Sequence, residues 1–278
     1  MNRIPAEDNG SASFIDESLL SALLSLSMEE EFNFDFAMFG IRQIVKSHPQ
    51  RFIRSVFSNR IEKKSRIFAF DILLEEDPGD IDDCIYEGLA AEFKAVSDEL
   101  LTSCSSPEAK ILPDPRESTK ILEVLCKTFA SQADASKVLW EKLKKDKSLL
   151  IDCVYVLRMV REAEKSSNED AKHKVDAEND PAFGFKRNLV KMIGNLTHRC
   201  KENQDLVRDI EGIQVLLDCS GMEDKNPFIT QWVVFALRNV CEDNEENQSV
   251  IAALKRLEMI AGGGPSSSRK NGDSENGC

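Results

Sequence analysis

The chain has 278 residues, of which 41 % are hydrophobic and 31 % are charged, and its formal net charge is −13. This balance excludes a wholly disordered chain. The negative charge argues against binding to nucleic acid or to anionic membranes, because both need Lys and Arg to face phosphates. The eight Cys are scattered singly, which indicates free thiols in a reducing compartment. The sequence shows neither a signal peptide nor an apolar run long enough to cross a bilayer, so we expect a cytoplasmic protein.

The first part of the chain reads as a polar terminus followed by helices of irregular spacing. Residues 1–13 are polar and are predicted to be disordered. Residues 14–115 carry apolar side chains at helical spacing and predict N-terminal irregular helical repeats. Within them, Asp77–Asp80 predicts a turn between helices, and a helix is expected over Ile81–Leu101. The pattern does not define the register of repeats before residue 118.

The helical pattern becomes sharper over residues 116–261, which predict armadillo-like repeats. The almost wholly polar stretch 164–180 predicts an insertion between the second and third helices of one repeat. Residues 262–278 consist mainly of Gly, Ser, Asn and charged residues, and predict a disordered tail. The incomplete repeat just before this tail is expected to leave apolar surface, which would permit docking or self-association.

One pattern occurs twice in this part of the chain, at a constant spacing of 44 residues. The first copy contains Asn195, Leu196, Asn203, Gln204, Val207, Ile210 and Ile213, and the second contains Asn239, Val240, Asn247, Gln248, Ile251, Leu254 and Leu257. A helical period of about 40–47 residues is typical of armadillo-type arrays. We therefore predict an all-α, right-handed α-solenoid. In one repeat, a short helix is expected after an Asn203 cap, with a turn at Gly212 and a third helix over Pro227–Glu242.

Asn195 and Asn239 are polar residues inside otherwise apolar predicted helices, which suggests that each has a hydrogen-bonding task. In armadillo proteins a third-helix Asn lines the concave groove and bonds the backbone of a bound peptide. The alternative is that each Asn ties down a neighbouring inter-helix loop. The peptide-binding motif places a Trp four residues before the Asn, but this chain has Lys191 and Phe235 there. We therefore do not expect an importin-like grip on basic peptides.

The sequence predicts a protein-binding ridge on the third helices of the last two repeats. Trp and Arg are favoured at interface hot spots, although ordinary packing between repeats would also explain a Trp. The predicted ridge comprises Asn188, Lys191, Asn195, Gln231, Trp232, Phe235, Arg238 and Asn239.

No motif assembles an active site, so we expect no catalytic residues, no cofactor and no metal. His198 and Cys200 lie close in sequence, but no second pair at zinc-site spacing accompanies them. The acidic stretch Asp77–Glu87 lacks oxygen ligands at the third and fifth positions of a calcium loop. An enzyme remains the competing class of function. It would require a pocket that gathers His198, a Cys and a carboxylate at hydrogen-bonding distance.

Residues 183–254 resemble the C-terminal domain of the ataxin-10 family. The resemblance is carried by Gly184-Phe185-Lys186, Ile193-Gly194-Asn195-Leu196, Glu202-Asn203-Gln204-Asp205, Gly212-Ile213, Asn226-Pro227-Phe228-Ile229, Trp232-Val233, Arg238-Asn239 and Glu242-Asp243-Asn244. A weaker likeness extends back through the helices expected over 118–160. The chain is expected to lack the early repeats of a full-length member.

The resemblance implies a non-catalytic, cytoplasmic interaction scaffold of the ataxin-10 type. The family is associated with neuronal survival, with neurite growth and with cell division. Its implied partners are a heterotrimeric G-protein β subunit and a glycosyltransferase that modifies cytosolic proteins. The alternative is a regulator of a G protein, whether heterotrimeric or small, or a regulatory subunit of a cytosolic enzyme.

Overall fold

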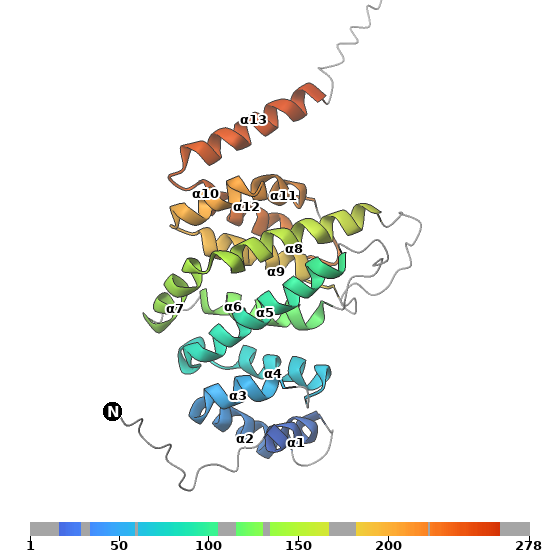
Figure 1. Ribbon diagram of the computed structural model, residues 1–278, viewed down its shortest axis with the longest axis vertical. Coiled ribbons are helices and arrows are strands. Elements are labelled where there is room, and N and C mark those ends of the chain that lie inside the picture. The colour runs from blue at the N-terminus through green and yellow to red at the C-terminus, as the bar shows by residue number, and fades with distance from the viewer. Residues whose placement is uncertain are drawn as a thin grey trace, which may run out of the picture.

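The computed structural model is built from helices that follow one another along the long axis of the molecule (Figure 1). It describes residues 17–28, 34–58, 61–104, 115–129, 134–166, 182–221 and 223–261. These residues form thirteen α-helices and one 3₁₀-helix and contain no strand, which confirms the predicted all-α class. The predicted disordered segments 1–13 and 262–278 lie outside the described residues, as does most of the predicted insertion 164–180.

The helices expected over Ile81–Leu101 and Pro227–Glu242 are present, at Asp83–Cys104 and Ile229–Cys241. In chain order the helices are α1 (Glu17–Met28), α2 (Phe34–Ser47), α3 (Pro49–Val56), α4 (Lys63–Glu75), η1 (Pro78–Asp80), α5 (Asp83–Cys104), α6 (Arg116–Phe129), α7 (Asp134–Lys145), α8 (Lys147–Ser166), α9 (Phe185–Thr197), α10 (Lys201–Asp209), α11 (Gly212–Asp218), α12 (Ile229–Cys241) and α13 (Glu245–Ala261). The turn predicted at Asp77–Asp80 is confirmed, because the Asp77 side chain caps η1 by accepting a hydrogen bond from the Gly79 N–H at 2.8 Å.

Most of the helices belong to two rows. In the first row α1, α4, α6, α9 and α12 each pack against the next, and in the second row α3, α5, α8 and α11 do the same. The rows also contact each other, through pairs such as α5 with α6 and α8 with α9. Figure 1 shows the result as a stack that rises from α1 and α2 to α13.

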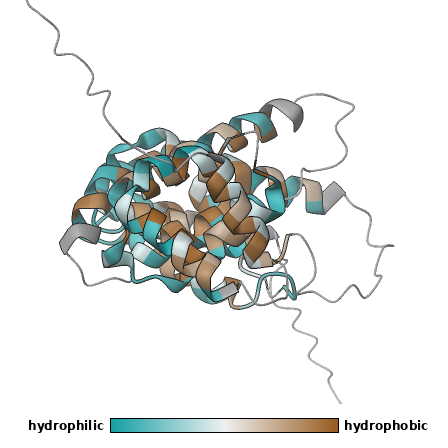
Figure 2. Cartoon of the chain, turned by 90° about the horizontal axis from the view of Figure 1, so that it is seen from below, coloured by the Kyte–Doolittle hydropathy of each residue, from teal (hydrophilic) through white to brown (hydrophobic). Residues whose placement is uncertain are grey.

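An apolar core runs between the rows and joins them into one body. Its largest fully buried side chains include Phe52, Phe70 and Phe93. Viewed along the long axis, many hydrophilic stretches lie on the outer rim, and hydrophobic ones face neighbouring helices (Figure 2). On α6, Leu122 and Leu125 are fully buried at the i and i+3 positions, as the predicted helical face requires.

The two sequence copies fold alike. Helices α9 and α12 have the same length, and both of their boundaries differ by 44 residues. The residue before each helix has a positive φ, 76° at Gly184 and 63° at Phe228. The turns that follow also match, with φ of 50° at Arg199 and 52° at Asp243. The 44-residue period is therefore a property of the backbone as well as of the side chains.

Two local predictions require correction. Asn203 does not cap a helix, because α10 begins at Lys201 with Cys200 as its N-cap. The Asn203 amide instead donates hydrogen bonds to the carbonyls of Leu196 and Lys144, at 2.8 and 3.0 Å. The polar stretch expected to begin at residue 164 is helical at its start, since α8 continues to Ser166.

Candidate protein-interaction surface

Helices α9 and α12 approach each other closely at Gly194. A Cβ at that position would lie 2.8 Å from Cε1 of Phe235 and 3.1 Å from the Cα of Ala236. The Asn239 side chain fixes the same contact, because its Nδ2 donates a 2.9 Å hydrogen bond to the Gly194 carbonyl. Glycine is therefore needed here to admit the neighbouring helix.

Three members of the predicted ridge lie inside the molecule. Asn188, Asn195 and Asn239 are 3 %, 1 % and 5 % exposed. Asn188 Nδ2 donates to the Thr119 carbonyl on α6 at 3.5 Å, and Asn239 joins α12 to α9. Within the described chain, Asn195 Nδ2 has no hydrogen-bond partner. The Asn188 and Asn239 amides thus link neighbouring helices of the first row, and little of any of the three side chains reaches the surface.

The other five predicted residues have exposed surface, and three of them form a cluster. The Lys191 ammonium lies 4.6 Å from the centroid of the Trp232 ring, which is cation–π geometry. Trp232 and Phe235 form an edge-to-face pair with ring centroids 5.6 Å apart. All three side chains are partly exposed. Gln231 and Arg238 lie on α12 with the two aromatic residues and are exposed. We call Lys191, Trp232 and Phe235 the aromatic cluster.

Charged side chains continue this surface along the first row, and sequence reasoning did not find them. Lys120 on α6 pairs with Asp71 on α4 at 2.9 Å and with Glu123 at 3.1 Å, and Glu123 pairs with Arg187 on α9 at 3.5 Å. Burial disfavours the charged form of Lys120, but the hydrogen bond to Asp71 and the two carboxylate charges outweigh this and raise its pKa. The only available signal was the repeat register, which the N-terminal pattern does not define.

A buried lysine fixes the start of α9. Lys186 is 1 % exposed, and its ammonium pairs with Glu164 of α8 at 2.7 Å and with Glu223 before α12 at 2.5 Å. The Gly184 N–H donates to the Lys225 carbonyl at 2.7 Å, which ties the same two segments together. The aromatic cluster therefore rests on helices whose starting points are held by both charge and backbone hydrogen bonds.

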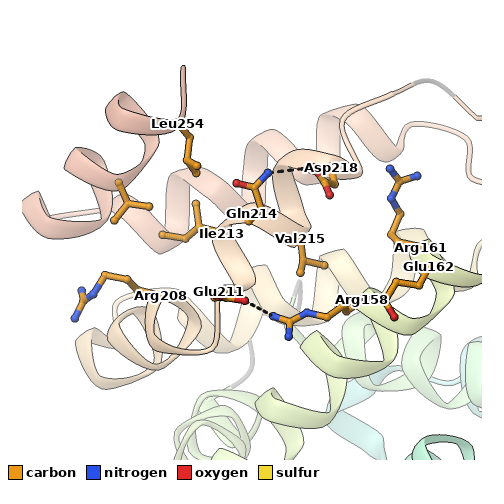
Figure 3. Close-up of a pocket in the computed structure, with 11 residues that line it drawn as sticks. Arg158, Arg161, Glu162, Arg208, Glu211, Ile213, Gln214, Val215, Asp218 and Leu254 are labelled. Atoms are coloured by element: carbon orange, nitrogen blue, oxygen red, sulfur yellow. Dashed lines mark hydrogen bonds and ion pairs between the residues drawn. The ribbon is translucent and has the colours of Figure 1, made fainter. Parts of the chain in front are cut away.

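A hollow lies beside the second row, between α8, α11 and α13 (Figure 3). It has a volume of about 570 Å³ and is lined by Arg158, Arg161, Glu162, Arg208, Glu211, Ile213, Gln214, Val215, Asp218, Val250 and Leu254. Two of its arginines are engaged within the protein: Arg158 donates to the Ile210 carbonyl at 2.6 Å, and Arg208 to Asn247 Oδ1 at 2.9 Å. With three acidic residues in the lining as well, the hollow is not an anion site.

The His–Cys–carboxylate site of the competing enzyme hypothesis does not assemble around Cys200. His198 Nδ1 lies 3.8 Å from Glu242 Oε2, whereas Cys200 Sγ lies 3.5 Å from a different carboxylate, that of Glu202. Burial raises the pKa of the Cys126 thiol to about 12, which keeps it protonated. The described residues contain no group of three His, Cys, Asp or Glu suited to a metal ion. None of the described helices is long and apolar enough to cross a membrane.

Comparison with known proteins identifies relatives of the region around the aromatic cluster. The family model for the spinocerebellar ataxia type 10 protein domain matches residues 185–263. Ataxin-10 of Xenopus tropicalis is 35 % identical over 181 residues, which cover 61 % of this chain and 36 % of that protein. Ataxin-10 of Bos taurus is 38 % identical over 141 residues, covering 49 % and 29 %. The ataxin-10 homolog of Dictyostelium discoideum is 46 % identical over 72 residues, covering 26 % and 12 %.

The matched region spans about a third of the length of the vertebrate relatives. No solved structure matches the chain. The family model begins at the first residue of α9 and ends just beyond α13, so it contains both 44-residue copies. The two-copy pattern, the family model and the relatives agree, and over residues 185–263 the chain carries the domain of the ataxin-10 family.

Proposed function

We propose that this protein is a non-catalytic interaction scaffold built as a right-handed α-solenoid of armadillo-like repeats. The order of the elements supports this assignment. The triplets α2–α3–α4, η1–α5–α6, α7–α8–α9 and α10–α11–α12 each contribute their second helix to one row and their third to the other. In this scheme α13 is the first helix of a further repeat. Arrays of this kind bind proteins along the ridge that their third helices form.

The observation that carries the binding site is the aromatic cluster. An ordinary core would bury Trp232 fully, and an ordinary surface would leave Lys191 in water, but here the cation stacks on a partly exposed ring. Trp and Arg side chains at the centre of a patch supply most of the energy of typical interfaces. We therefore place the partner on the aromatic cluster, with exposed Gln231 and Arg238 beside it. The buried Asn188, Asn195 and Asn239 position the helices underneath.

Membership of the ataxin-10 family guides the choice of partner and process. We propose, by that resemblance, a cytoplasmic role in neuronal survival, neurite growth and cell division. The partners to test first are a heterotrimeric G-protein β subunit and a glycosyltransferase that modifies cytosolic proteins.

The test measures the affinity of each purified partner for the wild-type chain and for a Lys191→Glu/Trp232→Ala variant. We expect the variant to lose about tenfold or more in affinity, because it removes a hot-spot ring and reverses the neighbouring charge. The matched control is Tyr155→Ala/Arg158→Glu, which removes a second cation–π pair, on α8 of the second row. Equal affinity of the wild type and the ridge variant, with both folded by circular dichroism, would overturn the assignment of the ridge.

A further inference from the structure

The two 44-residue copies allow each face of α12 to be compared with the equivalent face of α9. On α9, Val190 is 0 % exposed, and Gly194, one turn later, lies under α12. Their equivalents on α12 are Val234, which is 63 % exposed, and Arg238, which is also exposed. The equivalent of the fully buried Ile193 is Leu237, which is only partly buried. Helix α12 packs on one face of α9. Within the described part of the chain, no helix packs in the same way on the equivalent face of α12.

Helix α13 also buries its apolar side chains less fully than the equivalent helix α10 does. Val207 of α10 is fully buried, partly by the start of α11, where a Cβ on Gly212 would lie 2.8 Å from Val207 Cγ1. Its equivalent on α13, Ile251, is only partly buried. Val250 and Leu254 of α13 line the hollow beside α11. The Leu254 side chain extends toward Ile213 and Gln214 of α11 (Figure 3). Both comparisons indicate an empty position for the next helices of the array.

We propose that a partner protein fills this position with an amphipathic helix that packs on Val234, Leu237 and Arg238, which we call the end face. Residues 262–278 cannot fill this position, because they contain no aliphatic or aromatic side chain other than Pro265. The residue of α12 that is equivalent to Gly194 of α9 is Arg238, and this difference determines the chemistry of the partner helix. Its aliphatic side chains cover Val234 and Leu237, and a carboxylate meets the exposed guanidinium.

The way α12 lies on α9 defines the spacing in the partner helix. The α12 residues that touch α9 include Trp232, Phe235, Ala236 and Asn239, at i, i+3, i+4 and i+7. Phe235 is the side chain that lies over Gly194. In a helix that covers the end face, the residue equivalent to Phe235 lies over Arg238, so this is the position for the carboxylate.

The inference goes beyond the aromatic cluster and is testable with two synthetic helix-stabilised peptides. One has the sequence of residues 228–242, and the other carries Phe235→Glu within it. Wild-type protein should bind the Glu peptide about tenfold or more tightly than the unmodified peptide, because only the former pairs with Arg238. In Arg238→Gly protein the close approach seen at Gly194 is restored, so the preference should reverse in favour of the unmodified peptide.

Val234→Asp places a charge on the end face and should weaken the Glu peptide about tenfold or more. The matched control is Val138→Asp, which changes an equally exposed valine on α7 and should leave the affinity unchanged. The Lys191→Glu/Trp232→Ala variant should also bind the peptide normally, which separates this test from that of the proposed function. Failure of both peptides to bind, or insensitivity to Val234→Asp, would overturn the inference. It would also be overturned if wild-type protein alone sedimented as an oligomer that Val234→Asp dissociates, because a second copy would then occupy the end face.

Discussion

The two ends of the molecule join their helices by different chemistry. In the N-terminal part, ion pairs link successive helices within each row. Arg66 of α4 meets Glu117 of α6 at 2.6 Å, and Lys94 of α5 meets Asp146, just before α8, at 2.5 Å. In the C-terminal part, buried amides join the helices as well, beside the ion pairs of Lys186. Asn247 is fully buried and donates to the carbonyls of Val240 and Gln204 at 2.8 and 3.0 Å.

This difference explains why the 44-residue repeat can be recognised in the sequence of the C-terminal part but not in that of the N-terminal part. Asn203 and Asn247 each donate to the carbonyl seven residues earlier and to a carbonyl of the preceding helices, and each accepts from a cation, Lys147 or Arg208. A buried amide must satisfy fixed backbone acceptors, so the same residue has to recur at the same position. A partly exposed ion pair is satisfied by many combinations of residues and leaves no period.

The largest loss of stability should come from removing a buried amide side chain. Asn247→Ala removes the two hydrogen bonds that the amide donates and the one that it accepts from Arg208, and it leaves buried carbonyls unpaired. We therefore expect a loss of about 2 to 4 kcal/mol of unfolding free energy. Urea unfolding measures this loss, and hydrogen exchange should localise it to α10–α13. The control is Gln248→Ala, whose bond to the Cys241 carbonyl is exposed. If Asn247→Ala cost no more than this control, the amides would not be what holds the C-terminal copies together.

The α9–α12 contact should be the next most sensitive point. Gly194→Ala places a methyl group 2.8 Å from the Phe235 ring and close to the α12 backbone, and we expect a cost of about 1 to 3 kcal/mol from the displaced helix. Thermal unfolding measures it, and near-ultraviolet circular dichroism should report a changed environment of Trp232. Gly221→Ala is the matched control, because a Cβ there meets nothing within 4 Å. Equal stability of the two variants would show that α12 does not approach α9 so closely.

The smallest expected effect is on the pH dependence of stability, and it tests the charged side chains. Burial, reinforced by Asp98, raises the pKa of Asp152 from 3.8 to about 6. The folded state therefore disfavours the ionised carboxylate, and this destabilisation is absent below the unfolded pKa and complete above about pH 6. Asp152→Asn should gain about 1 kcal/mol at pH 7.5 and little at pH 4, a value reduced for partial hydration of the carboxyl group.

Thermal unfolding at the two pH values checks this expectation, with Asp146→Asn as the opposite control. Burial alone would raise the pKa of Asp146, but hydrogen bonds from Lys94 and Ser148 outweigh it and lower the pKa. Its ionised form therefore stabilises the fold, and the substitution should lower stability at pH 7.5. A gain for Asp152→Asn that persists undiminished at pH 4 would contradict the electrostatic origin.

Much of the fold could be predicted because helical periodicity and the 44-residue spacing are local properties of the chain. The face of α6 that carries Leu122 and Leu125 is an example, since spacing alone decides which side chains share one side of a helix. The candidate site was harder to predict. The sequence singled out Asn195 and Asn239 as polar residues in apolar helices, but periodicity does not say whether such an amide faces a groove or a neighbouring helix.

The sequence by itself determined the all-α class, the two equivalent copies and the likeness to the ataxin-10 family, because each rests on residues whose order along the chain is enough. Only the tertiary structure decided that Lys191 stacks on Trp232 and that Lys186 is enclosed by Glu164 and Glu223. It also decided that none of the described helices covers the face of α12 that contains Val234. These features join side chains from different helices. Their distances depend on how the rows pack, and helical spacing within one segment carries no information about that.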